Sequence, residues 1–413
     1  MPKTRTVFLL VLSLLVVGVS ATAPAQPVRV GDASQKGSLL VFPKVQVEIA
    51  DNGTVWFDTI ITIGNDHSLD VNLECFWVDA EQKTADFMFT LTGYQPTWFK
   101  ASDGLGSHGW GVSPFGPGNK EGELKCWAMA VNEATMEEYQ ALFNHLYGTA
   151  ILVDLRNAAS LEYSAYAFKG HYPDSSGVYK TRLGSTGTLV LDNNYPSPSY
   201  DTGSAYITFN FVTTPPPGSN APTASKTELT LVPLRQDLRQ DRLPTCTKAK
   251  FDVWNENEVK LTGAYQCIKC WFEGSLERIG IDKDPVSGRP TGYLGVNFSY
   301  RSLHTYMGRA RVTSVASTQC RNIFLANDPL DAAKKRDLCV DDIYNPGMNL
   351  QSRSPFIGLV STSIQVDEGA IFFGTTPVGA GAFVPSPFDP NKPDETVTIK
   401  YDPPGQTAAS KRR

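Results

Sequence analysis

The chain has 413 residues, a formal net charge of −5, and charges of both signs interspersed along its length. This length exceeds one typical hydrophobic core, so two domains are expected. Phosphate binding needs concentrated Lys and Arg, and the composition therefore argues against nucleic acid as a partner. The only basic cluster, Lys411–Arg413, ends the segment 403–413, which is predicted to be a disordered tail.

Residues 1–25 have the pattern of a secretory signal peptide. Basic residues precede the apolar run Phe8–Val19, and Ala23–Ala25 fits the small-residue cleavage pattern. We expect cleavage before Gln26, with Ala21 as an alternative site. The apolar run is shorter than the ~18 residues of a spanning helix, which disfavours an uncleaved anchor. The mature chain is therefore expected to be secreted, or to lie in the periplasm or on the outer cell surface, without a transmembrane segment.

The segment 213–227, TTPPPGSNAPTASKT, is predicted to be a linker between two domains. Its consecutive prolines cannot continue a sheet ladder, and its mixture of Gly, Ser, Ala and Pro cannot form a core. The domains predicted on either side are residues 26–212 and residues 228–402.

The two halves echo each other in the same order. LLVFPK in the first half matches LTLVPLR in the second, so that Pro43 and Pro233 differ by 190 positions. Asn65 and Asn255 also differ by 190 positions. VNLECFWVD then matches AYQCIKCWFEG, and LYGTAILVDLRNAAS matches YMGRARVTSVASTQC. A period this long predicts duplicated domains and not a solenoid.

The local pattern is mostly that of strands. Val55–Ile63 is rich in β-branched and aromatic residues and is followed by a Gly-Asn-Asp turn, and similar short runs recur in both halves. The predicted fold is all-β, with two tandem, duplicated β-sandwich domains of an Ig-like or jelly-roll-like kind. One short helix is expected in the first domain, because Thr135–Glu138 forms a capping box and apolar residues follow at helical spacing. Asp328–Leu338 is a candidate for its counterpart.

Disulfide bonds are expected to hold both halves. The seven cysteines are Cys75, Cys126, Cys246, Cys267, Cys270, Cys320 and Cys339. Cys75–Cys126 is the only pairing available within the first half. In the second half, Cys320 is expected to pair with Cys339, and Cys246 with Cys267 or Cys270, which leaves one thiol over.

Cys267-Ile268-Lys269-Cys270 is a C-x-x-C motif with several interpretations. Trp271 follows where haem attachment needs a His, and zinc would need further ligands at a matching spacing. Redox motifs of this kind open a helix, whereas this one lies in a strand-like run. Structural disulfides are favoured, metal binding and redox activity remain alternatives, and no metal site or cofactor is predicted.

No catalytic residue can be assigned from the sequence. The five histidines lie in separate segments and form no metal-binding pair, and neither a G-x-S-x-G elbow nor a phosphate-binding Gly loop occurs. His145 is interpreted as a cap at the end of the predicted helix. An enzyme would need a cleft in which His108, His145 or a pair of acids converge.

The segment Tyr94–Gly118 is the best candidate for a binding site. It combines Trp98, Phe99, Trp110 and Phe115 with many glycines and prolines, and a long irregular connection of this kind is often functional. Its rings could stack on sugars or anchor a protein partner. Alternatively, they fold back onto the domain as a local core.

Several motifs together resemble a family of exported bacterial β-rich proteins. They are the opening GSLLVFPK, the ITIGND and CFW runs, the KCWAM strand, and LYGTAILVDL with EYSAYAF, and they cover most of the first half. The resemblance implies export and a duplicated β architecture. It implies no activity and no catalytic residues.

These observations favour an exported extracytoplasmic binding or surface-structural protein without catalytic activity, which contacts a carbohydrate or protein partner at the cell surface through its loops. One alternative is a secreted hydrolase acting on polysaccharide or peptide. Another is a subunit of an extracellular assembly, joined through the odd cysteine or an exposed strand edge.

Overall fold

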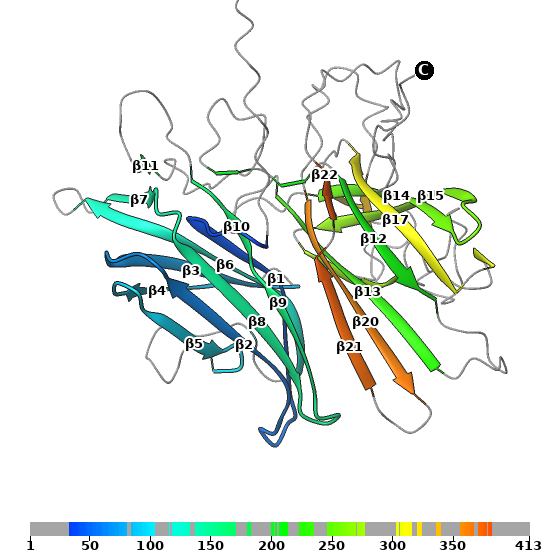
Figure 1. Ribbon diagram of the computed structural model, residues 1–413, viewed down its shortest axis with the longest axis horizontal. Helices are drawn as coiled ribbons and strands as arrows, with labels where there is room; N and C mark the ends of the chain where they lie inside the picture. The colour runs from blue at the N-terminus through cyan, green and yellow to red at the C-terminus, as the bar shows by residue number, and fades with distance from the viewer. Residues whose placement is uncertain are drawn as a thin grey trace, which may run out of the picture.

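The protein is described by a computed structural model. It describes residues 33–80, 84–103, 115, 118–132, 137–170, 180–182, 200–201, 203–204, 206–213, 223–234, 246–269, 271–276, 303–304, 306–315, 320–323, 336–339, 356–366, 371–377 and 379–381. Most of these residues form β-strands, arranged in antiparallel sheets (Figure 1), which confirms the all-β prediction. Within them, no helix has the length and apolar character needed to cross a membrane. The predicted signal peptide and tail lie outside the described residues.

One eleven-stranded sheet contains the strands of the first half. They are β1 (Leu39–Ile49), β2 (Val55–Asn65), β3 (Val71–Asp79), β4 (Thr84–Leu91), β5 (Pro96–Lys100), β6 (Gly118–Asn132), β7 (Glu137–Ala141), β8 (Leu146–Asp154), β9 (Ala159–Ser164), β10 (Tyr166–Phe168) and β11 (Lys180–Arg182). The order β11-β7-β6-β1-β2-β8-β9 forms its main path, while β3 pairs with β4 and β6, β5 with β2, and β10 with β1.

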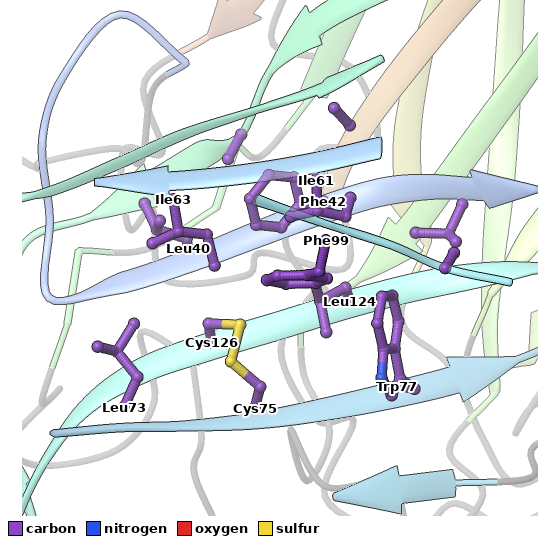
Figure 2. Packing of buried hydrophobic residues seen from close by; sticks show 14 of the residues in the cluster. Leu40, Phe42, Ile61, Ile63, Leu73, Cys75, Trp77, Phe99, Leu124 and Cys126 are labelled. Atoms are coloured by element: carbon purple, nitrogen blue, oxygen red, sulfur yellow. A yellow bond between two sulfur atoms is a disulfide. The ribbon is translucent and has the colours of Figure 1, made fainter. Parts of the chain in front are cut away.

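The apolar core of the first half joins two groups of these strands, β4-β3-β6-β1 and β5-β2-β8-β9 (Figure 2). Buried positions alternate with partly or fully exposed positions along β8, as expected of a strand with one face on a core. Trp77 of β3 packs against Phe99 of β5, with ring centroids 5.8 Å apart. The predicted Cys75–Cys126 disulfide joins β3 to β6 inside this core, where the two residues lie directly opposite each other.

The second half forms three further sheets. Their strands are β12 (Tyr206–Val212), β13 (Thr223–Pro233), β14 (Cys246–Asn255), β15 (Lys260–Lys269), β16 (Phe272–Ser275), β17 (Met307–Val315), β18 (Cys320–Ile323), β19 (Arg336–Cys339), β20 (Phe356–Val366), β21 (Ile371–Pro377) and β22 (Gly379–Gly381). The orders are β15-β14-β17-β12-β22, β16-β13-β20-β21 and β18-β19. A second core cluster joins the first two of these sheets.

The two halves share a buried interface. One apolar cluster includes residues of β1 and β6 together with residues of β13 and β20. The indole N–H of Trp271 donates to the carbonyl of Pro43 (2.7 Å), and the Tyr166 hydroxyl donates to the carbonyl of Gly358 (2.5 Å). These contacts bind side chains of one half to the backbone of the other.

A buried ion pair crosses the same interface. The Lys44 amine of β1 contacts the Glu273 carboxylate of β16, and Glu228 of β13 lies 3.9 Å away. Burial alone would lower the pKa of Lys44, but attraction by Glu273 and Glu228 outweighs it and raises the pKa above its ordinary value. Lys44 is therefore held in its charged form by partners from the other half of the chain.

The prediction of a helix after Thr135 is wrong. Glu137–Ala141 forms strand β7, which pairs with both β6 and β11. A helix this short is marginal on its own, whereas the ladders on both sides satisfy the backbone hydrogen-bonding groups of β7. The end of the second candidate helix is also a strand, because Arg336–Cys339 forms β19. The remainder of that candidate lies outside the described residues.

The strand pairing bears on the predicted linker and cysteines. Strand β12, placed by prediction in the first domain, pairs with β17, and β13 begins at Thr223 inside the predicted linker.

The β18–β19 hairpin sets Cys320 directly opposite Cys339. In the β14–β15 hairpin, Cys246 lies opposite Lys269 and Cys267 opposite Lys248. Cys270 lies outside the described residues.

Candidate functional site

The outward side of β5, β2 and β8 carries the best candidate site. We call it the first face and define it by Trp98, Thr62, Gly64, Tyr147 and Thr149. The register places Thr62 between Trp98 on β5 and Thr149 on β8, with Gly64 opposite Tyr147. The intervening residues of β2 point the other way, into the core. Strand alternation therefore gathers these five residues on one surface.

Two aromatic side chains are exposed on the first face. Trp98 is 58% exposed and Tyr147 is 44% exposed. They stand on the two neighbours of β2, so the strands that carry them are ~10 Å apart. Exposed rings on a regular sheet offer flat apolar surfaces to a ligand without any movement of the backbone.

Gly64 makes room for the Tyr147 ring. A Cβ atom at Gly64 would lie 2.3 Å from Cζ of Tyr147, far inside van der Waals contact. The phenol ring therefore lies across the backbone of β2, and only glycine permits this close approach.

Hydroxyl groups lie beside these rings. The Oγ1 atoms of Thr62 and Thr149 are 2.7 Å apart and share a hydrogen bond. The Thr149 backbone N–H also donates to Thr62 Oγ1 (3.2 Å). The first face thus combines apolar rings with hydroxyls whose orientation is fixed by the sheet.

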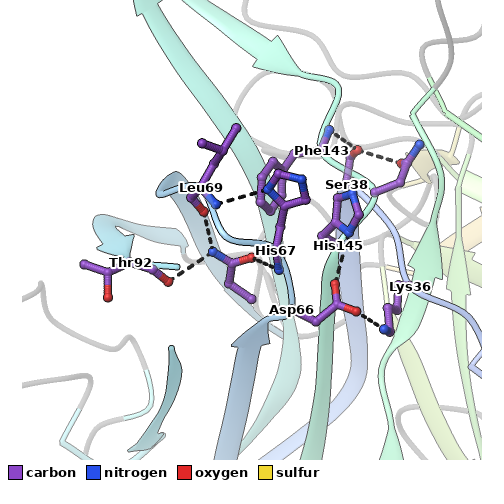
Figure 3. A network of polar contacts seen from close by, with 10 residues as sticks. Lys36, Ser38, Asp66, His67, Leu69, Thr92, Phe143 and His145 are labelled. Carbon is purple, nitrogen blue, oxygen red and sulfur yellow. Dashed lines mark hydrogen bonds and ion pairs between the residues drawn. The ribbon is translucent and has the colours of Figure 1, made fainter. Parts of the chain in front are cut away.

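At one end of the first face, where β2 ends and β8 begins, a polar cluster lies beside it (Figure 3). Asp66 Oδ1 lies 3.1 Å from Nδ1 of His145, and its other carboxylate oxygen contacts the Lys36 amine. The His67 and His145 rings are 4.4 Å apart, and Phe143 packs edge-on against both. The cluster is half-buried, and both histidines are held by neighbouring rings.

Asn65 builds the turn that holds this cluster. Its buried side-chain amide donates to the carbonyls of Leu69 (2.8 Å) and Thr92 (3.1 Å). Its Oδ1 accepts from the backbone N–H of His67 (2.8 Å). An Asx turn of this kind fixes the chain as it leaves β2 and sets the direction of His67.

The Asp66–His145 pair has the orientation of a carboxylate and imidazole in general-base catalysis. The nearby hydroxyl of Ser38, however, donates to Asn144 Oδ1 (2.8 Å) and accepts from the Phe143 backbone N–H (2.7 Å). Ser38 is fully buried, so this hydroxyl supports the structure and is not a nucleophile. Within the described part of the chain, no three His, Cys, Asp or Glu side chains are arranged to hold a metal ion.

Asp58 lies on β2 four positions before Thr62, at the other end of the first face. Its carboxylate accepts hydrogen bonds from the Ser102 hydroxyl (2.6 Å), the Ser102 backbone N–H (3.1 Å) and the Thr59 backbone N–H (2.8 Å). Burial raises the pKa of Asp58, and these hydrogen bonds oppose the shift without cancelling it. Asp58 therefore anchors the turn after β5.

The predicted aromatic residues separate into two groups. Trp98 is exposed on the first face, but Phe99 and Phe115 are each 1% exposed. Both packed rings contact Trp77 in the core, with centroids 5.8 Å and 5.6 Å away. The prediction that Phe99 and Phe115 contact a ligand is therefore corrected. Strand β5 turns Trp98 outward and Phe99 inward, and Phe115 packs into the same core. Trp110 lies outside the described residues.

The histidines also differ from expectation. Sequence reasoning treated them as separate, but the β2–β8 pairing brings His67 and His145 together. His67 follows β2 and His145 precedes β8, so the antiparallel pairing of these strands sets the two rings side by side, whereas the sequence predicted His145 at the end of a helix. His304 is exposed and lies before β17. His108 and His171 lie outside the described residues.

Comparison with known proteins does not place the chain in a family. No protein-family model matches it, and no curated protein matches its sequence. A β-glucuronidase from glycoside hydrolase family 2 is 6% identical, with a TM-score of 0.12 over 84% of this chain and 25% of the other. A calcium-binding mutant of Bacteroides uniformis beta-glucuronidase 2 is 8% identical, with a TM-score of 0.12 over 85% of this chain and 27% of the other. The chain spans about a quarter of the length of these enzymes, and a likeness this weak carries no argument.

Proposed function

We propose that this protein works outside the cytoplasm as a non-catalytic binding protein for carbohydrate at the cell surface. The observation that carries the proposal is the first face, where the exposed rings of Trp98 and Tyr147 flank the hydroxyls of Thr62 and Thr149. Sugar rings present apolar faces edged with hydroxyl groups, so flat aromatic surfaces beside fixed hydroxyls suit them. The contact surface is then a sheet face and not only a loop.

We also propose that the chain consists of two tandem, duplicated β-sandwich domains. Two buried or half-buried asparagines support this proposal. Asn65 Oδ1 accepts from the backbone N–H of His67 (2.8 Å), and Asn255 Oδ1 accepts from that of Asn257 (3.0 Å). The same turn therefore follows the matching strands β2 and β14. Both strands also pair antiparallel with a matching later strand, β8 or β17.

The proposed location rests on the signal-peptide pattern and on the disulfide. Structural disulfides persist in oxidising compartments, and Cys75–Cys126 is fully buried in the first core. Amino-terminal sequencing of the exported protein tests the location. The expected first residue is Gln26, and an uncleaved chain would contradict it.

The binding proposal is tested by affinity electrophoresis through gels containing starch, xylan or galactomannan. At least one polymer is expected to retard the protein. Trp98→Ala/Tyr147→Ala should weaken that interaction by at least about tenfold, because exposed aromatic anchors carry most of the energy of such contacts. Trp56→Ala is the matched control. Trp56 is an exposed tryptophan on β2, the strand of Thr62, and lies ~20 Å along it from Thr62.

Two results would contradict the proposal. One is that no polymer retards the parent protein. The other is that Trp98→Ala/Tyr147→Ala, folded as judged by near-UV circular dichroism, is retarded as strongly as the parent and as Trp56→Ala. The first result would contradict the proposed binding function, and the second would contradict only its assignment to the first face.

A secreted hydrolase is the second candidate, and the Asp66–His145 pair favours it. If this pair were a general base, Asp66→Asn and His145→Gln would each slow the release of reducing sugar or peptide by at least about a hundredfold. Binding in the affinity gel would be kept. Absence of any product from the parent protein excludes this candidate and leaves the binding proposal intact.

A further inference from the structure

The second half carries its own outward sheet face on β14, β15 and β17. Along β14, Ala249, Phe251 and Val253 point into the core, so the alternating residues Lys250, Asp252 and Trp254 lie on the opposite side. The register places Trp254 between Lys260 of β15 and Arg309 of β17, and Asp252 opposite Arg311. We call this the second face and define it by Lys250, Asp252, Trp254, Lys260, Arg309 and Arg311.

Three cations surround the Trp254 ring. The Lys260 amine lies 5.6 Å from the ring centroid, and the guanidinium carbons of Arg309 and Arg311 lie 5.8 Å and 5.7 Å from it. Each distance is within the range of a cation–π interaction. These contacts hold the indole in one orientation on the sheet, with a positive charge on each neighbouring strand.

Among the six residues of the second face, Asp252 is the single carboxylate. Asp252 is buried, and its Oδ2 accepts from Arg311 Nη2 at 2.6 Å. Its Oδ1 has no hydrogen-bond partner, and the Lys260 and Lys250 amines lie 3.7 Å and 3.9 Å away. Lys260 and Arg309 are exposed. The second face therefore holds four cations against one carboxylate, in a protein whose net charge is −5.

The turn beyond β14 limits this positive surface. Glu256 and Glu258 are exposed in the hairpin that joins β14 to β15. On the other side, β12 brings only Thr208 and Asn210 opposite Arg311 and Arg309. The concentrated charge thus lies around Trp254 and extends over three strands.

The second face occupies the same place in its half as the first face does in the other. Gly64 pairs with Tyr147 one position before the Asn65 turn, and Trp254 pairs with Arg309 one position before the Asn255 turn. The aromatic ring has moved from the later strand to the earlier one. An arginine now stands where the first face has its tyrosine.

We propose that the second face binds an acidic, carboxylate-bearing polysaccharide. This inference rests on the proposed carbohydrate-binding function and adds the ligand class of a second site. The Trp254 ring offers a stacking surface, and the exposed Lys260 and Arg309 flank it at the distance of neighbouring strands. A sugar carboxylate beside a stacked ring would meet one of these cations and form a charge-assisted hydrogen bond.

Single-stranded nucleic acid also combines negative charge with rings that stack, but the second face suits it less. Proteins that bind such strands line a groove with several aromatic rings and follow the backbone with a long row of cations. Here one indole and four cations are grouped, and Glu256 and Glu258 adjoin them. Nucleic acid is therefore the alternative outcome of the test.

The experiment measures the affinity of the full exported chain for polygalacturonate by titration calorimetry, with galactomannan and a dT oligonucleotide as comparison probes. Arg309→Gln should weaken polygalacturonate binding by about tenfold, because it removes a charge-assisted contact. Binding by the parent should weaken as salt is added, and Lys260→Gln/Arg309→Gln should abolish the binding. Arg156→Gln is the matched control, since it also removes an exposed arginine, and it should bind like the parent.

Trp254→Leu separates stacking from charge. It keeps an apolar side chain but removes the aromatic face, so affinity should fall while the salt dependence is retained. Because Trp254 is partly covered by its neighbours, each variant is compared with the parent by thermal unfolding. The two exposed cation variants keep the test valid if Trp254→Leu is unstable.

The outcomes separate the two proposals. Polygalacturonate binding that is lost in Lys260→Gln/Arg309→Gln but kept in Trp98→Ala/Tyr147→Ala supports the second face. A parent that binds galactomannan but not polygalacturonate overturns this inference alone, as does acidic-polymer binding that survives in the cation variants. Tighter binding of the dT oligonucleotide overturns it as well. A parent that binds no polysaccharide overturns both proposals.

Discussion

Removing the Cys75–Cys126 disulfide should destabilise the first half by about 4 kcal/mol. The bond joins residues 51 positions apart. In the chain-entropy description, closing a loop of that length changes the entropy of the unfolded chain by roughly −2.1 − 1.5R ln n, in cal/mol/K. Multiplied by the temperature, this is about 4 kcal/mol at 25 °C. Cys75→Ala/Cys126→Ala also removes two fully buried sulfur atoms from the core, and the lost packing adds to the effect.

The assay is urea unfolding of the parent and of this variant, followed by Trp fluorescence and by far-UV circular dichroism. Trp77 is fully buried in the same core, so its emission contributes to the signal from the first half. Two probes are needed because a chain of this size need not unfold in one step. A variant that loses less than about 1 kcal/mol would refute the argument, because the bond would then not restrict the unfolded chain as its loop length requires.

Three further predictions concern charges and the first face. Lys44→Met should destabilise the protein by ~3–5 kcal/mol because it leaves the buried Glu273 carboxylate without its cation. In thermal unfolding, Lys44→Met/Glu273→Leu should recover most of the stability lost in the single variant. Equal losses in the single and double variants would contradict this. The raised pKa of Asp58 means that its folded form binds a proton more tightly than its unfolded form. Its favourable contribution to folding stability is full below the unfolded pKa of ~3.9 and is lost as pH rises through the folded pKa. The stability of the parent relative to Asp58→Asn should therefore increase as pH falls from about 7 to 4. A difference in melting temperature between the parent and Asp58→Asn that does not change with pH would contradict this prediction. Gly64→Ala should displace the exposed Tyr147 ring and weaken binding in the affinity gel, with a change in unfolding free energy below about 1.5 kcal/mol. Unchanged retardation would show that the ring position does not matter.

The elements predicted best are those whose side-chain pattern is set by burial. Val55–Ile63 was expected as a strand from its β-branched and aromatic residues, and β2 covers Val55–Asn65. Cys75–Cys126 could be paired because the first half offers no other partner. In both cases the feature that determines the structure, the residue pattern of the strand or the lack of another cysteine, can be read directly from the sequence.

The helix prediction failed because its signal was local. A capping box and helical spacing favour a helix by small amounts, whereas β7 gains a hydrogen-bonded neighbour on each side. Strand β6 ends at Asn132, shortly before β7, and β11 begins only at Lys180, so neither pairing can be seen within the segment itself. Pairing with both neighbouring strands therefore decided the conformation.

The candidate site was predicted only in part for a related reason. Trp98 and Phe99 are adjacent in sequence and were treated as equivalent, yet they lie on opposite sides of β5. Recognising PTWFK as a strand would have separated them by alternation. Tyr147, Thr62 and Thr149 join Trp98 through strand pairing alone, so composition could not have grouped them.

The proposed duplication of the two halves implies that some positions of the fold can differ and that others cannot. Asn65 and Asn255 both direct their side chains to the backbone of the following turn, where a residue lacking an amide would leave donors and acceptors unpaired. Gly64 and Trp254, one position before them, take no part in these hydrogen bonds. A change from Tyr147 opposite Gly64 to Arg309 opposite Trp254 leaves the sheet ladder intact, because both pairs stand on the outward side. Under these proposals, the ligand chemistry of the two halves can therefore differ while the turn and the strand pairing beneath each face match.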